Sequence, residues 1–356
     1  MMISVLRIPP SVTGKNNRMS ENEKYTGFAI ALAWPETFCK QPGSWYDPLA
    51  LRLGMNNNHY YRVGHAAVVL IDRENNKSHY FDFGRYHTPF QHGRVRSVDT
   101  DHELSMKTIA AISPDNAAIL NYREILSELQ SNKACHGEGN LHASYCPVNF
   151  QAAFDKAAQM QQEGPIPYGP FRITGSNCSR FVNTVLRAGK PSWKFGFRLK
   201  YMMWFTPTPM NNVNSLKHRK EIPAQLNTIP FFPTRKLDNN SLKSTLKPPI
   251  RQPNIPKNAQ WLGGEGAGSW FVFDLKFSHI KVTRFSPDGV TECSCYYKNK
   301  YGQVVLPDNS YRITYPSNCQ VISLANNRQY LQFDRVSDFH PVMEKIDIGN
   351  SVPVFN

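Results

Sequence analysis

Residues 175–186 read GSNCSRFVNTVL, and residues 64–72 read GHAAVVLID. The first stretch predicts an amphipathic helix with Cys178 at its start, and the second predicts a buried strand headed by His65. A thiol at a helix N-terminus lies near the positive end of the helix dipole and near unpaired N–H groups, which favour the thiolate. An imidazole on a strand is a suitable base for such a thiol. The two stretches therefore predict a nucleophilic site if the fold brings them together.

The strand that follows the histidine supplies a candidate for the third group of this site. Residues 79–85 read HYFDFGR, and strand alternation places Tyr80 and Asp82 on one face. A carboxylate on a paired strand can bond the far nitrogen of an imidazole and fix its tautomer, so we expect Asp82 to orient His65. At the helix start, Ser176 or Asn177 is expected to cap the helix. The Cys178 N–H and the Asn177 amide are candidate oxyanion donors.

Each of these residues also has a structural interpretation. A cysteine in a helix start is often a small buried hydrophobic residue, and a histidine at a strand start is often a hydrogen-bonded edge residue. The candidate substrate-binding residues are Arg85, Tyr80, Trp45 and Tyr168. An arginine can bind an anionic group and the aromatic rings can wall a cleft, but loop anchoring and core packing are open alternatives. The same choice applies to His87, Arg94 and Arg96.

Composition limits the partners. The chain has 356 residues, 40% of them hydrophobic, and a net charge of +14 that favours an anionic substrate or surface. No run is apolar for the roughly 18 residues that would span a bilayer, and no specific nucleic-acid motif is present. The apolar run at 28–34 predicts a core strand rather than a signal segment, so we expect a cytoplasmic protein.

The seven cysteines are odd in number and scattered, which favours reduced thiols over a disulfide framework. Cys135, His136, His142 and Cys146 match no common zinc spacing. We therefore expect no metal and no cofactor. The glycine-rich run at 263–268 lacks the Lys-Ser/Thr of a phosphate loop and precedes a strand pattern.

Four segments are expected along the chain. Residues 1–24 form a loose arm, 25–204 an α+β domain with helices packed on an antiparallel sheet, 205–260 a proline-rich linker, and 261–356 a small β-rich domain. Within the α+β domain we expect strands over 25–34, 60–72 and 79–85. We expect helices from Ser113 onward and over 149–163 and 179–188.

The histidine strand, the YFDFG strand and the later SNCSRFV segment resemble the circularly permuted papain-like superfamily, which includes NlpC-like and lecithin:retinol acyltransferase-like enzymes. The resemblance covers roughly residues 25–200 and implies a nucleophilic Cys178, a basic His65 and a third group that falls on Asp82. Acyltransferase-like members often have histidine at the third position, so aspartate is closer to a hydrolase arrangement. The whole chain also resembles an uncharacterised bacterial family of unknown function, through motifs such as WPET at 34–37 and GAGSWF at 266–271.

The sequence thus predicts a thiol-dependent hydrolase or acyltransferase that cleaves an amide or ester bond through a Cys-His-Asp site and a thioester. Its substrate is unknown. The alternative is a non-catalytic binding protein on a papain-like scaffold, whose basic surface meets an anionic partner. A nucleophilic thiol should lie in a cleft within reach of an imidazole, whereas a scaffold cysteine should lie among aliphatic groups.

Overall fold

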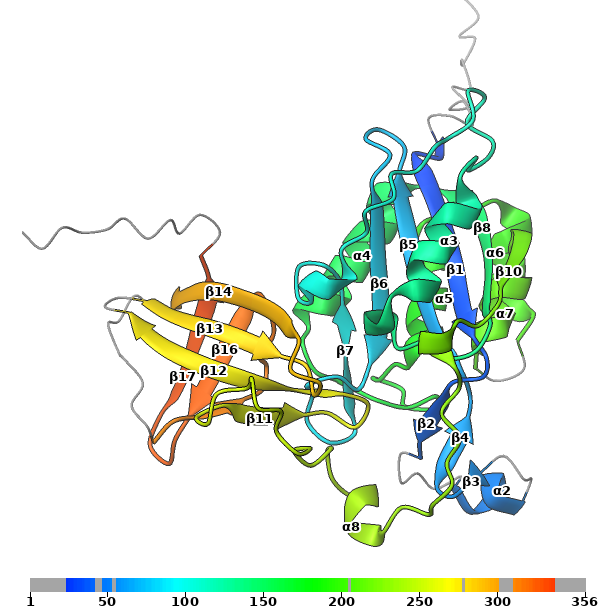
Figure 1. Ribbon diagram of the computed structural model, residues 1–356. Helices are drawn as coiled ribbons and strands as arrows, with labels where there is room; N and C mark the ends of the chain where they lie inside the picture. The colour runs from blue at the N-terminus through cyan, green and yellow to red at the C-terminus, as the bar shows by residue number, and fades with distance from the viewer. Residues whose placement is uncertain are drawn as a thin grey trace, which may run out of the picture.

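The computed structural model describes residues 24–41, 47–52, 56–203, 206–276, 279–300 and 310–336. These residues form two units, each built around a seven-stranded sheet (Figure 1). The predicted α+β class is confirmed: helices pack on an antiparallel sheet in the first unit, and the second unit is β-rich. Among the described residues, no helix is both long and apolar enough to cross a membrane. The predicted N-terminal arm, up to residue 23, and Trp45 lie outside the described residues.

The first sheet has the order β10-β8-β1-β5-β6-β7-β9, and its paired strands are antiparallel. The strands are β1 (Gly27–Trp34), β5 (His65–Asp72), β6 (Ser78–Gly84), β7 (His92–Arg96), β8 (Leu141–Val148), β9 (Ile166–Pro167) and β10 (Lys217–Ile222). The interior strand β1 is buried along its whole length, which explains its continuous apolar sequence.

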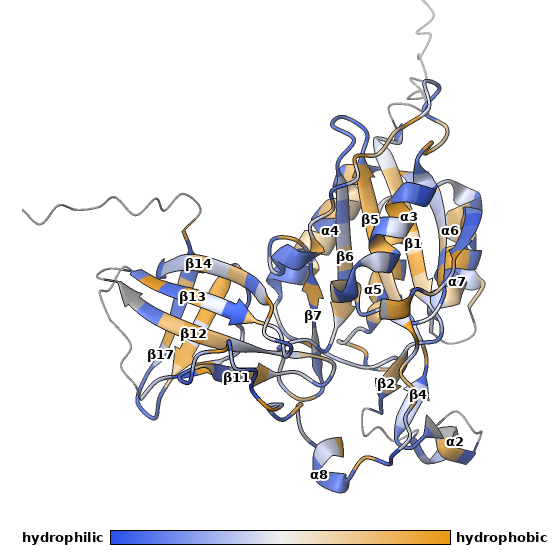
Figure 2. Cartoon of the chain, viewed as in Figure 1, coloured by the Kyte–Doolittle hydropathy of each residue, from blue (hydrophilic) through white to orange (hydrophobic). Residues whose placement is uncertain are grey.

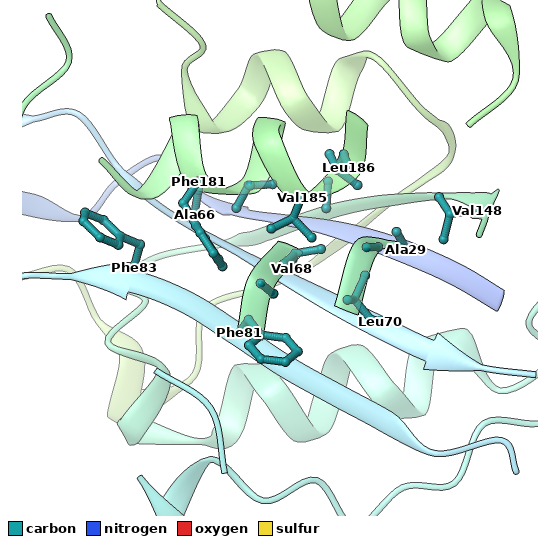
Figure 3. Packing of buried hydrophobic residues seen from close by; sticks show 14 of the residues in the cluster. Ala29, Ala66, Val68, Leu70, Phe81, Phe83, Val148, Phe181, Val185 and Leu186 are labelled. Atoms are coloured by element: carbon teal, nitrogen blue, oxygen red, sulfur yellow. The ribbon is translucent and has the colours of Figure 1, made fainter. Parts of the chain in front are cut away.

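Helices cover both faces of this sheet. They are α3 (Tyr122–Ser131), α4 (Phe150–Gln162), α5 (Cys178–Ala188), α6 (Trp193–Tyr201) and α7 (Pro209–Asn214). Helix α3 packs in one core cluster, and α4 and α5 pack in the other. Figure 3 shows Phe181, Val185 and Leu186 of α5 directed at Ala66 and Val68 of β5, so the apolar face of α5 fixes its start beside that strand.

The predicted strand over 60–72 is interrupted. It consists of β4 (Tyr60–Arg62) and β5, separated by a turn at Gly64, whose φ is +75°. A Cβ at Gly64 would lie 2.9 Å from Pro35 Cα, so both the dihedral and the space favour glycine. The turn makes His65 the first residue of β5. Strand β4 instead pairs with β2 (Phe38–Lys40) and β3 (Asn56–Asn57), near the short helix α2 (Asp47–Arg52).

The second unit has the strand order β11-β12-β13-β14-β17-β16-β15. Its strands are β11 (Gln260–Gly263), β12 (Gly268–Lys276), β13 (His279–Phe285), β14 (Thr291–Asn299), β15 (Arg312–Thr314), β16 (Val321–Ala325) and β17 (Tyr330–Arg335). Figure 2 shows apolar segments on several of these strands, and residues such as Phe271, Val282 and Tyr297 form a separate core.

Buried ion pairs join the two units. Arg284 of β13 is fully buried and pairs with Asp101 at 3.2 Å and with Glu103 at 2.7 Å, and both acids belong to the first unit. Arg85, just after β6, pairs with Glu265 of the second unit. Because a buried charge without its partner is costly, these pairs hold the second unit in a defined place against the first.

Two sequence expectations need correction. The helix expected from Ser113 begins only at Tyr122, because the Ser113 hydroxyl accepts bonds from the N–H groups of Ala117 and Ala118 and closes a turn instead. The linker expected over 205–260 begins later, because α7 packs on β1 and β10 pairs with β8. The connector proper follows Ile222 and includes the short helix α8 (Asn239–Leu242).

Leu186→Ala should lower the free energy of unfolding by about 2–5 kcal/mol, since Leu186 is fully buried where α5 packs on the sheet. Leu120→Ala is the control: Leu120 is 66% exposed, and its loss should change stability by no more than about 0.5 kcal/mol. Urea denaturation followed by circular dichroism measures both. Equal losses would contradict the packing described for α5.

Candidate functional site

The structure brings His65, Asp82 and Cys178 together at the end of the first sheet. His65 and Asp82 lie on one face of the paired strands β5 and β6, where Ala67 is the direct partner of Asp82. The His65 Nε2 atom lies 3.5 Å from Asp82 Oδ2. Cys178 begins α5, and its thiol interacts with the His65 side chain and with the Ala66 N–H. With Nε2 directed at the carboxylate, Nδ1 is the ring nitrogen left for the thiol.

Asp82 is fully buried and held by several donors. Arg96 Nε donates to Asp82 Oδ1 at 2.9 Å, Arg96 Nη2 donates to Oδ2, and the Tyr80 hydroxyl donates to Oδ2 at 3.0 Å. Burial raises the pKa of Asp82, but the Arg96 guanidinium and His65 more than offset it and hold the pKa below its usual range. The carboxylate therefore stays ionised beside the imidazole.

The imidazole and the thiol shift each other toward an ion pair. Burial lowers the pKa of His65, but the interactions with Asp82 and Cys178 outweigh burial and raise that pKa to about 9. Burial raises the pKa of Cys178, but the bond to His65 and the His65 charge outweigh it and lower that pKa. Both side chains are nearly buried, with His65 5% and Cys178 7% exposed. The arrangement favours thiolate and imidazolium together at neutral pH.

Three residues that support the imidazole directly or through a neighbour were not assigned this role from the sequence. Trp34 is the cross-strand partner of His65, and its ring stacks on the imidazole at 5.9 Å between centroids. Gln130 of α3 accepts a hydrogen bond from the Trp34 indole at 2.8 Å. Arg96 was considered only as an anion-binding or loop-anchoring residue. The register of β7, which sets Arg96 opposite Asp82, is the signal that would have paired them.

The start of α5 is capped by Asn177. Its Oδ1 accepts the Arg180 N–H at 2.8 Å, so the amide oxygen is committed to the helix. Ser176 is buried and pairs with Tyr168 in an isolated bridge, where it fixes the loop before the helix and is not the cap. The Cys178 N–H lies at the first helical position, where backbone N–H groups have no partner within the helix.

Most of the predicted substrate-binding residues contact other side chains or backbone groups of the protein. Arg85 is buried between Glu265 and the Lys40 carbonyl, which it reaches at 2.6 Å, so its placement favours anchoring over substrate binding. Tyr80 bonds to Asp82 behind the site. The Tyr168 ring stacks on Phe83 at 5.9 Å and also lines the cavities.

The neighbouring basic residues are engaged as well. Arg94 pairs with Asp101, and His87 lies 2.8 Å from Ser269 of the second unit. Among the described residues, no group of three or more histidine, cysteine or acidic side chains is arranged to hold a metal ion. Of the four residues considered for zinc, Cys135 and His136 lie at the short helix 133–135, and His142 and Cys146 lie on β8.

Two neighbouring cavities lie at the site, one lined by the thiol and the other by the imidazole. The one lined by Cys178 and Asn177 has a volume of about 560 Å³, and the one lined by His65 and His136 has a volume of about 360 Å³. They share the lining residues Cys39, Lys40, Arg85 and Tyr168. Mainly apolar side chains line the first cavity: Pro35, Val63, Pro170, Phe171, Pro207, Pro209 and Met210. Lys40, Arg62 and Arg85 also line the first cavity, and the second has the charged side chains Lys40, Arg85, Glu138, Lys247 and Glu265.

Comparisons with known proteins match the two units separately. Residues 29–195 match the model of a family described as type VI secretion system effector TseH-like, and residues 259–336 match that of the DUF6695 C-terminal domain. The crystal structure of the type VI secretion system effector TseH matches with 17% identity and a TM-score of 0.36. That match covers 56% of this chain and 94% of the TseH chain. No curated protein matches the chain.

The first family match spans His65, Asp82 and Cys178 and supports a relation to TseH-like effectors. The expected resemblance to a family of unknown function is supported over the C-terminal unit, where the DUF6695 model matches.

Iodoacetamide should label Cys178 at neutral pH much faster than Cys39, which lines the same apolar cavity but whose pKa burial raises to about 12. His65→Ala should slow Cys178 labelling at neutral pH by at least about tenfold, since the paired charge is lost. Peptide mass spectrometry resolves the seven free thiols. Labelling of Cys178 that begins only near pH 9, as for an ordinary thiol, would contradict the ion pair.

Arg96→Met should cost about 3–5 kcal/mol of stability at neutral pH, because it removes the guanidinium that donates to both oxygens of the buried Asp82 carboxylate and leaves only His65, at 3.5 Å, as a cation. Asp82 has a lowered pKa in the folded state, so its contribution is present above its unfolded pKa of about 4 and is lost as the pH falls. The cost should therefore shrink in acid. Arg62→Met, which removes an exposed pair with Glu36, is the control and should cost about 0–1 kcal/mol. Denaturant titrations at several pH values measure both.

Proposed function

We propose that the chain is a thiol-dependent hydrolase or acyltransferase that cleaves an amide or ester bond, with Cys178 as nucleophile, His65 as acid and base, and Asp82 as the orienting carboxylate. One observation carries the proposal. The thiol at a helix start contacts an imidazole whose far nitrogen faces a buried carboxylate at 3.5 Å. This is the geometry that nucleophilic catalysis requires.

The proposed reaction has two stages. The Cys178 thiolate attacks the carbonyl carbon, and the resulting oxyanion lies by the Cys178 N–H at the positive end of α5. The His65 imidazolium gives its proton to the departing amine or alcohol as the carbon–heteroatom bond breaks, which leaves a thioester. His65 then removes a proton from water, or from another acceptor, that attacks the thioester and restores the thiolate. We favour water as the acceptor, because an aspartate as the third group resembles the hydrolases of the papain-like superfamily more than its acyltransferases.

We place the acyl part and the leaving group of the substrate in different cavities. The acyl carbon must lie next to Cys178 Sγ, so the acyl part occupies the mainly apolar cavity that the cysteine lines. The leaving group takes its proton from His65, so it lies in the cavity with the charged lining. We therefore favour a substrate with an apolar acyl side and a polar, charged leaving group.

The match to the TseH-like family also supports a proposal about where the chain acts. A type VI secretion system effector is delivered out of the cell that makes it. We propose that this chain is made in the cytoplasm and acts as a hydrolytic effector after delivery.

Production of the chain in a bacterial host, either in the cytoplasm or directed to the periplasm, tests this function. We expect growth inhibition in at least one compartment and a loss of about 10³-fold or more in hydrolysis for Cys178→Ala. Cys146→Ala is the matched control, since it removes a thiol from the sheet core outside both cavities. Inhibition by Cys178→Ala equal to that by the parent chain would favour the non-catalytic binding protein.

The rate of hydrolysis should also depend on pH in a defined way. The His65 pKa is raised, so the imidazolium that protonates the leaving group is present below about pH 9 and is lost above it. We expect kcat/KM to fall on the alkaline side with a midpoint near pH 9. A profile that falls near pH 6.5, the pKa of an ordinary histidine, would contradict the assignment.

A further inference from the structure

Helix α6 presents a stripe of large aromatic side chains to solvent. Trp193, Phe197 and Tyr201 recur every fourth residue, so they lie on one face of the helix, and their side chains are 76%, 54% and 59% exposed. The Phe197 and Tyr201 rings lie 5.1 Å apart between centroids. Phe195 and Leu199 on the opposite face are buried and pack in the core of the first unit. The fold therefore uses one face of α6, and the described part of the chain leaves the other, apolar face exposed.

Basic side chains flank the aromatic stripe. The Lys194 ammonium lies 5.8 Å from the centre of the Trp193 ring, and the Lys200 ammonium lies 4.8 Å from the centre of the Tyr201 ring. The surrounding sequence has no opposing charge, because residues 164–220 contain no aspartate or glutamate. The basic residues of this segment are Arg172, Arg180, Arg187, Lys190, Lys194, Arg198, Lys200, Lys217, Arg219 and Lys220.

Helix α6 is joined to α5 and precedes part of the lining of the apolar cavity. The Asn183 amide at the middle of α5 donates to the Leu199 carbonyl in the C-terminal half of α6 at 2.9 Å. The chain then continues into residues 206–210, which line the cavity beside Cys178. Two further exposed apolar residues, Phe171 at 49% and Ile173 at 97%, lie in the loop before α5.

We propose that the exposed face of α6, formed by Trp193, Phe197, Tyr201 and the adjacent basic side chains, binds the surface of an anionic phospholipid bilayer. Tryptophan and tyrosine favour the boundary between headgroups and acyl chains, and lysine and arginine are attracted to anionic headgroups. A helix with aromatic residues on its exposed face and flanking basic residues is suited to lie in that boundary. Binding at this face does not depend on the chemistry of Cys178.

Co-sedimentation with lipid vesicles tests the proposal. The full chain should bind vesicles of phosphatidylcholine mixed with phosphatidylglycerol and should bind phosphatidylcholine vesicles at least about tenfold more weakly, since each basic residue near an anionic surface contributes roughly a fivefold gain in affinity. Replacing Lys194, Arg198 and Lys200 by glutamine should lower affinity for the anionic vesicles by about 100-fold. Equal binding to the two kinds of vesicle would overturn the proposal.

A matched pair of triple variants tests the aromatic stripe. Trp193→Ser, Phe197→Ser and Tyr201→Ser together should abolish measurable binding, while circular dichroism and the melting temperature stay near those of the parent chain because these side chains are exposed. The control replaces three exposed apolar residues elsewhere, Ile109→Ser, Leu120→Ser and Val290→Ser, and should bind as the parent chain does. Loss of binding in the control, or its persistence in the stripe variant, would show that α6 is not the binding face.

Discussion

The candidate site depends on the buried contact between Asp82 and Arg96. A carboxylate with no solvent exposure is costly unless a cation and hydrogen-bond donors compensate it, and here Arg96 and Tyr80 do so. Only as an ionised group can Asp82 raise the pKa of His65, and only as an imidazolium does His65 lower the pKa of Cys178. The reactivity proposed for the thiol therefore depends on a pair that does not touch it.

The strand register that stabilises the first sheet also places the residues of the site. Antiparallel pairing sets Trp34 opposite His65 and Arg96 opposite Asp82, so the backbone ladder that closes the sheet also places the groups around the imidazole. The second unit meets the first just beyond these strands, where Arg85 pairs with Glu265 and Arg284 pairs with Asp101. Residues of the connector and of the second unit, such as Lys247 and Glu265, complete the cavity beside His65. The role we assign to the second unit is to close that cavity.

Much of this could be predicted from local sequence, and the rest required long-range contacts. The apolar runs of β1 and β5, the asparagine cap before Cys178 and the alternation in β6 are local patterns, and the α+β class predicted from them is confirmed. The sequence left it undecided whether Arg85 binds substrate or anchors a loop, because its partner Glu265 is 180 residues away. Strand β10 was assigned to the linker because its exposed, basic sequence shows no apolar alternation; pairing with β8 at the sheet edge stabilises it. The helix expected from Ser113 was wrong at its start, because side-chain bonds favoured a turn over a helix cap.

The protonation state of His65 tests the central claim most directly. Nitrogen-15 NMR of the imidazole, titrated from pH 5 to 10, reports it without a substrate, and His65→Ala assigns the resonance. We predict an imidazolium through neutral pH with a midpoint near 9, and a lower midpoint in Cys178→Ala, which removes one group that raises the His65 pKa. A midpoint at or below about 6.5 in the parent chain would mean that burial outweighs Asp82, and that Cys178 has no charged partner.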